Sequence, residues 1–453
     1  MPERSSRSSV YLEVSPDEQR SPGPAEPDAP FRILVLGDFS GRTSRGLHSQ
    51  LAGRRPVSVD RDNLDEVLAG MGVAIRLPAI ALQFSGMDDF HPDRIYQRAQ
   101  IFRDLSEAPE PVAPSTTPAA PAPAQTRPGL SGSSLLDQMI EETGDAPTAA
   151  VEASGDLAEF LKKAVAPHLV PREDPRRRER VERLHSAAGA MMRTILHHPD
   201  FQALEAAWRA IFMLVRGLDT DGDLKLYLFD ATRQELIDDL AGTAKLLTEQ
   251  KEPWAIVAGN YVFGQTEEDA EQLGRLGKIA REAGAPFLAE AVPPSDSEAS
   301  PGWRLLRGSP EAGSIGLALP RFLLRVPYGE KTSPVESFAF EEMPTSVHRD
   351  YLWGNPAFCC AYLLGQAFLT YGWNLRPGVH RQIDGLPLHV YQEDGGSVVK
   401  PCAEVLLTEK EADLLMERGI MPLASLKDQG AVLLVRFQSI ANPLAALSGR
   451  WSG

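Results

Sequence analysis

A proline- and alanine-rich stretch, residues 106–133, constrains how this chain can fold more than any other feature of the sequence. It runs SEAPEPVAPSTTPAAPAPAQTRPGLSGS, with a proline every few residues and alanine, serine and glycine between them. No helical or strand period of apolar residues survives there, so this composition predicts an extended, semi-rigid linker. The linker divides the chain into two folded blocks, residues 31–105 and 134–453.

A second proline-rich stretch, residues 15–30, predicts a hinge. It follows a short β-like stretch, VYLEV at residues 10–14, so residues 1–30 are interpreted as an N-terminal strand with its hinge. At the usual size of about 150 residues per domain, the whole chain is long enough for about three domains.

The first block predicts alternating strands and helices. Its opening, FRILVLGDF, is a short apolar strand, and Asp62 or Asn63 can cap a helix whose apolar residues are Leu64, Val67 and Leu68. Residues 73–84 alternate as a strand does, and residues 88–105 have the spacing of a capped helix. Because these elements form only a small core, we expect the block to need a partner surface.

The second block begins with helical segments and then alternates. Strands are predicted at LKLYLF, WAIVAGNY and PFLAEAV, separated by the helical segments RQELIDDLAGTAKLL and EEDAEQLGRLGKIAREAG. This alternation predicts a parallel sheet covered by helices. Residues 351–373 predict a long buried helix, and the short strands LPLHVYQ, AEVLLT and AVLLVRF follow it. The predicted fold class is therefore α/β (α+β).

Charge and composition exclude several classes of partner. The chain has 62 acidic and 46 basic residues, a net charge of −16, which disfavours nucleic acid. The arginine run Arg176–Arg178 is interleaved with glutamates, which predicts an ion-paired, solvated helix face. No apolar run reaches the length of about 18 residues that direct membrane insertion needs, and the first thirty residues lack a signal peptide's apolar stretch. Three cysteines predict no disulfide framework, which favours the reducing cytoplasm.

Glycine pairs and aspartate clusters give only partial matches to ligand-binding motifs. The pairs Gly37/Gly41 and Gly259/Gly264 follow strands but lack the Lys-Ser/Thr or third glycine of a phosphate loop, so turn glycines are predicted. A calcium loop is suggested by aspartates with near-EF-hand spacing, but the required glycine is displaced by two positions and the last ligand is too short. Those aspartates are Asp219, Asp221, Asp223 and Asp230. A solvated turn is the preferred interpretation.

Histidine and cysteine patterns give no stronger indication of chemistry. His197 and His198 are adjacent, so they point about 100° apart on a helix and rarely share a metal; Asp200 capping the next helix is preferred. Cys359 and Cys360 lie in the most apolar helical segment, as small hydrophobic residues do. No nucleophile elbow occurs. We predict no catalytic residue, no cofactor and no metal site, and no enzyme.

Three stretches of the first block resemble the small sheath subunit (TssB type, or VipA) of bacterial type VI secretion systems. They are PFRILVLGDFSGR (30–42), RRPVSVDRDNLDEVLAGMGVAIRL (54–77) and MDDFHPDRI (87–95), and VYLEV matches the short strand ahead of the family's first domain. The resemblance covers about residues 8–105.

The second block resembles the large sheath subunit (TssC type, or VipB) over about residues 133–453. The matching stretches include SSLLDQMIEE (133–142), HHPDFQALEAAWRAIFMLV (197–215), RVPYGEKTSPVESFAFEE (325–342) and YLWGNPAF (351–358). Two departures from the family are expected. Both subunits lie on one chain, with the linker replacing further helix of the small subunit after Leu105, and the large subunit's C-terminal region, including a strand that pairs with neighbouring protomers, is lacking.

The resemblance implies a structural subunit of a contractile sheath, which surrounds an inner tube and drives it outward. It implies that strands donated across subunits link the protomers, and that recycling by an AAA+ ATPase acts on one helix. The donated strand would be Val10, Tyr11, Leu12, Glu13 and Val14; the apolar face of the ATPase helix would be Leu135, Leu136, Met139 and Ile140. For that helix, ordinary docking onto the body is an equally supported interpretation. Implied partners are other sheath subunits, the inner tube protein, the ATPase and the baseplate, all in the bacterial cytoplasm.

Two alternatives remain at this point. The chain keeps one donated strand and lacks the other, which favours a cap or adaptor that binds sheath ends without propagating them. A cytosolic enzyme on the α/β core is a remote alternative, because it would require a pocket with convergent ionisable groups.

Overall fold

The computed structural model describes residues 23–107, 175–294, 299–393 and 395–451. The chain divides into two units, one of residues 1–105 with 185–453 and one of residues 106–184. The second unit is described only at its two ends, the last residues of α3 (Gln100–Glu107) and the first half of α6 (Pro175–Leu196). In α6, Arg178 pairs with Glu182 and Arg183 with Glu179, which confirms the predicted ion-paired helix face. The strand at residues 10–14 and the helix at residues 135–140 lie outside the described residues.

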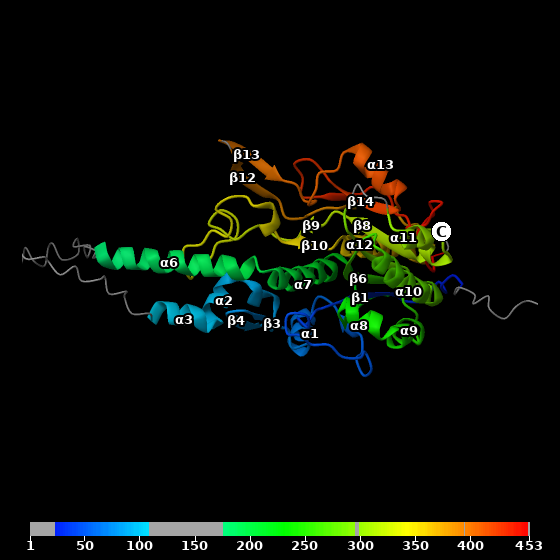
Figure 1. Ribbon diagram of the computed structural model, residues 1–453, viewed down its shortest axis with the longest axis horizontal. Helices are drawn as coiled ribbons and strands as arrows, with labels where there is room; N and C mark the ends of the chain where they lie inside the picture. The colour runs from blue at the N-terminus through cyan, green and yellow to red at the C-terminus, as the bar shows by residue number, and fades with distance from the viewer. Residues whose placement is uncertain (1–22, 108–174, 295–298, 394, 452–453) are drawn as a thin grey trace, which may run out of the picture. The chain divides into compact units, whose positions relative to one another are not determined.

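The first unit is built around a nine-stranded sheet (Figure 1). Its strands, in spatial order, are β11 (Gln382–Ile383), β15 (Val432–Leu434), β14 (Ile420–Ser425), β8 (Ile315–Leu319), β7 (Phe287–Ala291), β6 (Ile256–Phe263), β1 (Phe31–Gly37), β5 (Leu224–Asp230) and β2 (Val57–Val59). The six strands from β14 to β5 run parallel, and β2, β15 and β11 are antiparallel to their neighbours. This confirms the α/β fold class with a parallel sheet.

Strand β1, the opening of the first block, lies inside the sheet of the second block. It pairs with β5 along its whole length and with β6 on its other side. All seven of its residues are buried. Its continuous apolar run is what a parallel strand with both faces covered requires. Ile33 and Val35 face one core, and Leu34 and Leu36 face the other.

Helices cover both faces of this sheet. One core holds α7 (Pro199–Gly217) and α12 (Pro356–Tyr371). The other holds α8 (Arg233–Asp238), α9 (Leu240–Thr248), α10 (Glu267–Ala283), α11 (Pro301–Arg307) and α13 (Glu409–Glu417). Side-chain caps at Thr232 and Thr266 begin α8 and α10 where the sequence predicts helices, and Ser300 caps α11, which the sequence analysis does not predict. No helix among the described residues is long and apolar enough to cross a membrane.

The rest of the first block packs against α7 rather than around a core of its own. It consists of α1 (Leu64–Gly70), the hairpin of β3 (Ala74–Leu77) and β4 (Ile80–Gln83), η1 (Met87–Phe90), α2 (Pro92–Arg98) and α3. The ring of Phe84 stacks on Phe90 at 4.2 Å between centroids, and both meet Phe201 of α7 edge-on. The partner surface that this block was expected to need is therefore the second block.

Several predicted elements differ in detail. Residues 73–84 form a hairpin rather than one strand, and residues 88–105 are interrupted at Ala99, whose extended backbone separates α2 from α3. The predicted helix RQELIDDLAGTAKLL breaks at Asp239, whose side chain caps α9 instead. The predicted strand AEVLLT is an irregular segment with one bridge, from Ala403 to Phe322.

Two small sheets lie apart from the large one. One joins β9 (Phe322–Leu323) to β10 (Trp353–Gly354), and the other is a hairpin of β12 (His389–Glu393) and β13 (Gly396–Lys400). Short 3-10 turns complete the fold: η3 (Pro310–Ser314), η4 (His348–Asp350) and η5 (Gly372–Asn374).

Candidate functional site

The polar residues with the densest contacts gather where β1 and β5 end. After β1 the chain forms β2 and β5 on one side of β1, and then crosses to form β6 on the other side, so the direction of the chain across the sheet reverses here. In open α/β sheets a crevice at such a point is the usual ligand site. Asp38 and Asp230 stand at this edge, directly after β1 and at the end of β5.

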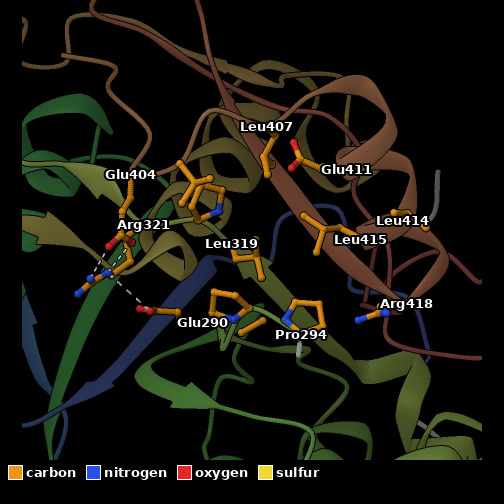
Figure 2. Close-up of a pocket in the computed structure, with 14 residues that line it drawn as sticks. Glu290, Pro294, Leu319, Arg321, Glu404, Leu407, Glu411, Leu414, Leu415 and Arg418 are labelled. Atoms are coloured by element: carbon orange, nitrogen blue, oxygen red, sulfur yellow. Dashed lines mark hydrogen bonds and ion pairs between the residues drawn. The ribbon is translucent and has the colours of Figure 1, made fainter. Parts of the chain in front are cut away.

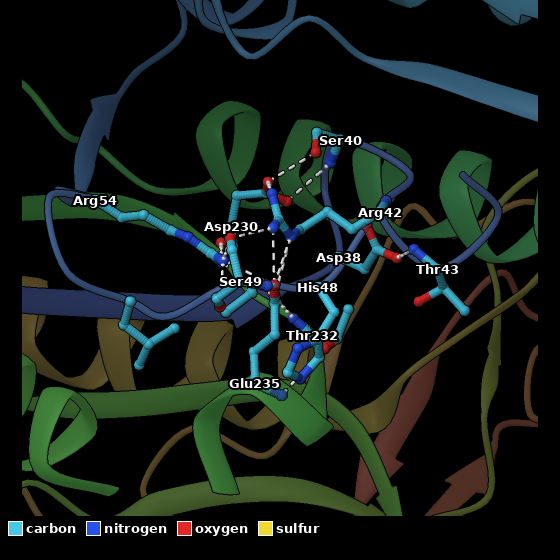
Figure 3. Close-up of polar contacts among 12 residues, drawn as sticks. Asp38, Ser40, Arg42, Thr43, His48, Ser49, Arg54, Asp230, Thr232 and Glu235 are labelled. Carbon is cyan, nitrogen blue, oxygen red and sulfur yellow. Dashed lines mark hydrogen bonds and ion pairs between the residues drawn. The ribbon is translucent and has the colours of Figure 1, made fainter. Parts of the chain in front are cut away.

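Both aspartates are occupied by donors from the loop that follows β1. Asp230 accepts hydrogen bonds from the backbone N–H groups of Phe39 and Ser40 at 2.8 and 2.9 Å, and from the Ser40 hydroxyl at 2.7 Å. Asp38 accepts from the N–H groups of Arg42 and Thr43 at 2.6 and 2.7 Å. Figure 3 shows these side chains turned toward the loop. The two carboxylates fold residues 38–43 onto the sheet edge.

Glu235 is the centre of a larger network that joins the two blocks (Figure 3). Its carboxylate, in the first turn of α8, is fully buried and accepts hydrogen bonds from Arg42 at 2.7 Å and from Arg54 at 2.7 Å. The N–H of Ser49 donates to it at 2.9 Å, and Thr232 completes a capping box with it. Two arginines and a backbone amide of the first block are therefore held by one carboxylate of the second.

The network keeps the carboxyl group of Glu235 ionised, as the direction of its pKa shift indicates. Burial alone would raise it, but hydrogen bonds from Arg54 and Arg42 outweigh that effect and hold the pKa well below its usual range. Burial lowers the pKa of Arg42, yet the hydrogen bond and attraction to Glu235 raise it overall. A carboxylate that stays ionised and fully bonded is not available for proton transfer. The arrangement joins two segments of chain rather than performing acid–base chemistry.

A second set of contacts fixes the first block to α7 and to the loop after β9. The indole N–H of Trp208 donates to the backbone oxygen of Phe39 at 2.8 Å, inside the core. Asp93 accepts from the N–H groups of Glu336 and Ser337, at 3.1 and 2.8 Å. Burial would raise the pKa of Asp93, but the bonds from Ser337 and Glu336 lower it. The junction therefore extends from the sheet edge to the far end of the first block.

A buried ion network lies next to this second set of contacts. Arg325 is bonded through its Nε to Glu205 and through its Nη1 to Glu342, each at 2.7 Å, and all three side chains are nearly or fully buried. Arg209 bonds Glu205 at 2.7 Å and the Tyr328 hydroxyl at 2.9 Å. Buried charges persist only when paired in this way. The network holds the segment after β9 against α7.

An open groove of about 580 Å³ is the other candidate site (Figure 2). It lies at the C-terminal ends of β7 and β8, and its walls are mainly apolar, with Leu319 and Leu415 among them. At one end, Arg321 makes a bidentate pair with Glu404, at 2.8 and 2.6 Å, and a longer contact of 3.9 Å with Glu290. Burial raises the pKa of Glu290 to about 7, and the attraction of Arg321 offsets only part of this rise.

The residues of the partial motifs are placed only in part as the sequence predicts. Gly37 is the last residue of β1 and Gly259 lies inside β6, so these two are strand residues rather than turn glycines. Gly41 has a positive φ of 74°, and a Cβ there would lie 2.1 Å from the Ala74 oxygen, so it is a turn glycine. Cys359 and Cys360 are buried in α12. Helix α7 is capped by the Nδ1 of His198, which accepts from the N–H of Asp200; Asp200 is not the cap.

The aspartates of the suggested calcium loop do not converge. Asp219 accepts a turn hydrogen bond from the N–H of Asp221, whereas Asp230 faces the loop after β1. Among the described residues, no group of three or more His, Cys, Asp or Glu side chains is arranged to hold a metal ion.

Sequence reasoning did not single out the junction, although one signal was present. Thr232 and Glu235 have the spacing of a capping box, which is a local pattern. Arg42 and Arg54 carry no such pattern, because they are separated from Glu235 by more than 180 residues. Their role depends on the insertion of β1 beside β5.

Both blocks of the chain match known protein families. The VipB family, described as EvpB/VC_A0108, tail sheath N-terminal domain, matches residues 178–296 and 295–441, more than half of the chain. The chain therefore belongs to the VipB tail sheath family. Residues 4–113 match a second family, described as Type VI secretion system, VipA, VC_A0107 or Hcp2.

A curated relative and two solved structures are also similar. The type VI secretion system sheath protein TssC1 of Pseudomonas aeruginosa is 34% identical over 294 residues, and the match covers 56% of this chain and 59% of that protein. The anti-feeding prophage baseplate has a TM-score of 0.30 at 16% identity, covering 52% of this chain and 51% of that one. The contracted helical sheath of the anti-feeding prophage has a TM-score of 0.29 at 19% identity, covering 52% and 54%. The chain thus spans little more than half the length of these proteins.

Proposed function

We propose that this chain is a structural subunit of a type VI secretion-like contractile sheath, which assembles around an inner tube and contracts to drive it outward. The observation that carries the proposal is that two sheath families match the two blocks of one chain, and the matched residues share one sheet. We propose no enzymatic activity, because the densest polar cluster, at Asp230 and Glu235, is engaged by donors of the chain itself.

The junction suits a part that transmits force. A sheath that contracts by moving its subunits requires each subunit to move as one body. Here β1 has strand partners on both sides, and Glu235 bonds two arginines across the junction. Separating the blocks would break these contacts together and expose buried charge. Contraction is therefore proposed to act between copies, not between the blocks of one copy.

Links between copies are proposed to form by strand donation. Val10–Val14 remain the proposed donor, with the proline-rich hinge giving reach. Open strand edges support a recipient role for the body. In the part of the chain that the structure describes, β12 and β13 pair only with each other, and β2 is an edge of the large sheet. Such edges accept an added strand.

The remaining partners are proposals from family membership. They are the inner tube protein, the baseplate, and a recycling AAA+ ATPase that would hold Leu135, Leu136, Met139 and Ile140. A bacterial cytoplasmic location is proposed with them.

Negative-stain electron microscopy of the purified chain tests the proposal, with the chain alone and mixed with full-length small and large subunits. Tubes from the chain alone, or its incorporation along mixed tubes, are expected. Discrete particles that shorten or end the mixed tubes would assign a cap instead. If the chain neither forms nor alters tubes, the sheath function is contradicted.

Deletion of residues 1–14 tests the donated strand separately. The shortened chain is expected to keep its circular dichroism spectrum and lose association with sheath partners. Unchanged association would remove Val10–Val14 from the mechanism, and the intact chain is the control.

A further inference from the structure

Two exposed apolar surfaces of the first unit carry charged groups of opposite sign: a carboxyl group on one and a guanidinium group on the other. The first is the groove at the C-terminal ends of β7 and β8. The second, which we call the α12 patch, consists of Leu369, Tyr371, Arg376, Val379, His380 and Arg381. Exposed apolar surface of this kind marks interaction sites.

The groove has apolar rims and a carboxyl group without its own cation. Val405 and Leu414 line it and are 45% and 47% exposed, and Leu406 beside it is 65% exposed. At one end, two carboxyl groups share one guanidinium, because Arg321 is bidentate to Glu404 and reaches Glu290 only at 3.9 Å. Glu411 and Arg418 also line the groove, away from this end. Figure 2 shows Glu290 and Arg321 meeting at this end of the groove. A further cation entering there would complete the pairing.

The α12 patch carries a cation that has no carboxylate partner among the described residues. Tyr371 and Val379 are 48% and 46% exposed, and His380 binds the Thr370 hydroxyl at 3.1 Å, which keeps the loop against the end of α12. Arg376 is exposed beside them, and its guanidinium has no ion pair among the described residues. The patch therefore offers an unpaired cation within apolar surroundings.

The two surfaces lie at opposite ends of the parallel strands. Phe368 and Trp373, at the end of α12, contact the ring of Phe31, the first residue of β1, at 4.6 and 5.2 Å between centroids. The groove contains Glu290 and Leu319, near the C-terminal ends of β7 and β8. Because these strands run parallel, a contact between the surfaces joins two copies head to tail. A head-to-tail contact is heterologous and extends into a helical filament when it does not close.

We propose that copies of this chain associate head to tail, with the α12 patch of one copy seated in the groove of the next and Arg376 beside Glu290. The apolar rims, Val405 and Leu414 on one copy and Tyr371 and Val379 on the other, cover each other. This contact rests on the proposed assembly of the chain into a sheath, and adds a side-chain interface to the strand donation proposed above. Charge pairing across it fixes which two surfaces meet.

Engineered cysteines test the contact directly, because the chain's three cysteines are all buried. Val379→Cys and Leu414→Cys are introduced together, assembly is induced, and a short bismaleimide cross-linker is added. A ladder of dimers, trimers and longer species is expected on a denaturing gel. The variants with one cysteine each are expected to stay monomeric. The pair Leu47→Cys with Leu414→Cys is the matched control, because Leu47 is 43% exposed and lies outside both the α12 patch and the open strand edges.

The charge pair is tested in the same assay with Arg376→Gln, which removes the charge and shortens the side chain, and Glu290→Gln, which removes the charge at nearly the same size. Each is expected to lower the ladder yield about tenfold, and the two together little more than either alone. A yield equal to the control pair, or dimers from Leu414→Cys alone, would overturn the head-to-tail contact. Tubes without a ladder would contradict this contact and leave the sheath function standing. A ladder without tubes would support this contact and contradict the sheath function.

Discussion

At the scale of single residues, Glu235 decides whether the two blocks remain joined. Its carboxylate is fully buried and bonds Arg42 and Arg54. Glu235→Gln keeps the shape and removes the charge, which leaves Arg54 without its ion pair and Arg42 with only a longer contact of 3.7 Å to Asp230. The free energy of unfolding is expected to fall by about 3 kcal/mol, measured by urea denaturation.

Glu271→Gln is the matched control for that variant. Glu271 also pairs with an arginine, Arg275, but its side chain is 63% exposed. A change within about 0.5 kcal/mol is expected. If the two variants lose the same stability, the junction network does not carry the stability assigned to it.

Replacing Glu290 is expected to raise the free energy of unfolding, whereas replacing Glu235 is expected to lower it. Burial raises the pKa of Glu290 to about 7 from an ordinary value of 4.5. Between these pH values the folded chain holds a proton that the unfolded chain has lost. The stability contributed by this group is therefore present at low pH and falls as the pH rises from 4.5 to 7. Glu290→Gln is expected to match the wild type at pH 5 and exceed it at pH 8 by up to about 3 kcal/mol.

Urea denaturation of both proteins at the two pH values measures this difference. Comparing variant with wild type at each pH cancels the contribution of other carboxylates, including Glu342, whose pKa is lowered to about 2. A difference between the two proteins that does not change with pH would contradict the assignment.

At the scale of elements, β1 belongs to the sheet of the second block although it lies on the other side of the linker. Without it, β5 and β6 would each expose a strand edge within the sheet. Residues 175–453 produced alone are therefore expected to be insoluble or to aggregate. Co-expression with residues 23–107 as a separate polypeptide is expected to give a soluble complex, measured by co-purification.

Cleavage within the linker is the control for this experiment. A protease site inserted in residues 106–133 of the intact chain is expected to yield two fragments that stay together after cutting. Cooperative unfolding of residues 175–453 alone would contradict the shared sheet.

Local patterns predicted most elements but not their pairing. The apolar run of β1 and the capping residues of α8 and α10 are local signals, and the structure has those elements where they were expected. The break at Asp239 was missed because its other carboxylate oxygen accepts from the N–H of Leu51, which is distant in sequence. Likewise, no periodicity within the first block specifies that β1 enters between β5 and β6.

The candidate site was less predictable than the fold for the same reason. Arg42, Arg54 and Glu235 become neighbours only after β1 is inserted. The sequence resemblance identified the sheath families correctly, because it uses extended stretches of residues rather than local periodicity. The donated strand at residues 10–14 and the helix at residues 135–140 lie outside the described residues and stay predictions.

At the scale of the whole molecule, the two sheath-family segments form one folded body that is proposed to move as a unit during contraction. The five buried apolar side chains of β1 belong to cores that also contain α7, α12 and α10. Elements that share a core unfold together, so their backbone amides exchange through the same opening. A body of this kind passes force from one segment to the other.

Amide hydrogen exchange of the intact chain, followed by mass spectrometry, tests this central claim most directly. Peptides covering β1 (31–37), β5 (224–230) and β6 (256–263) are expected to exchange with the same slow rate, set by global unfolding. Their protection is expected to fall together in Glu235→Gln. Fast exchange of β1 while β5 and β6 remain protected would show that the first segment opens separately, and would contradict the account.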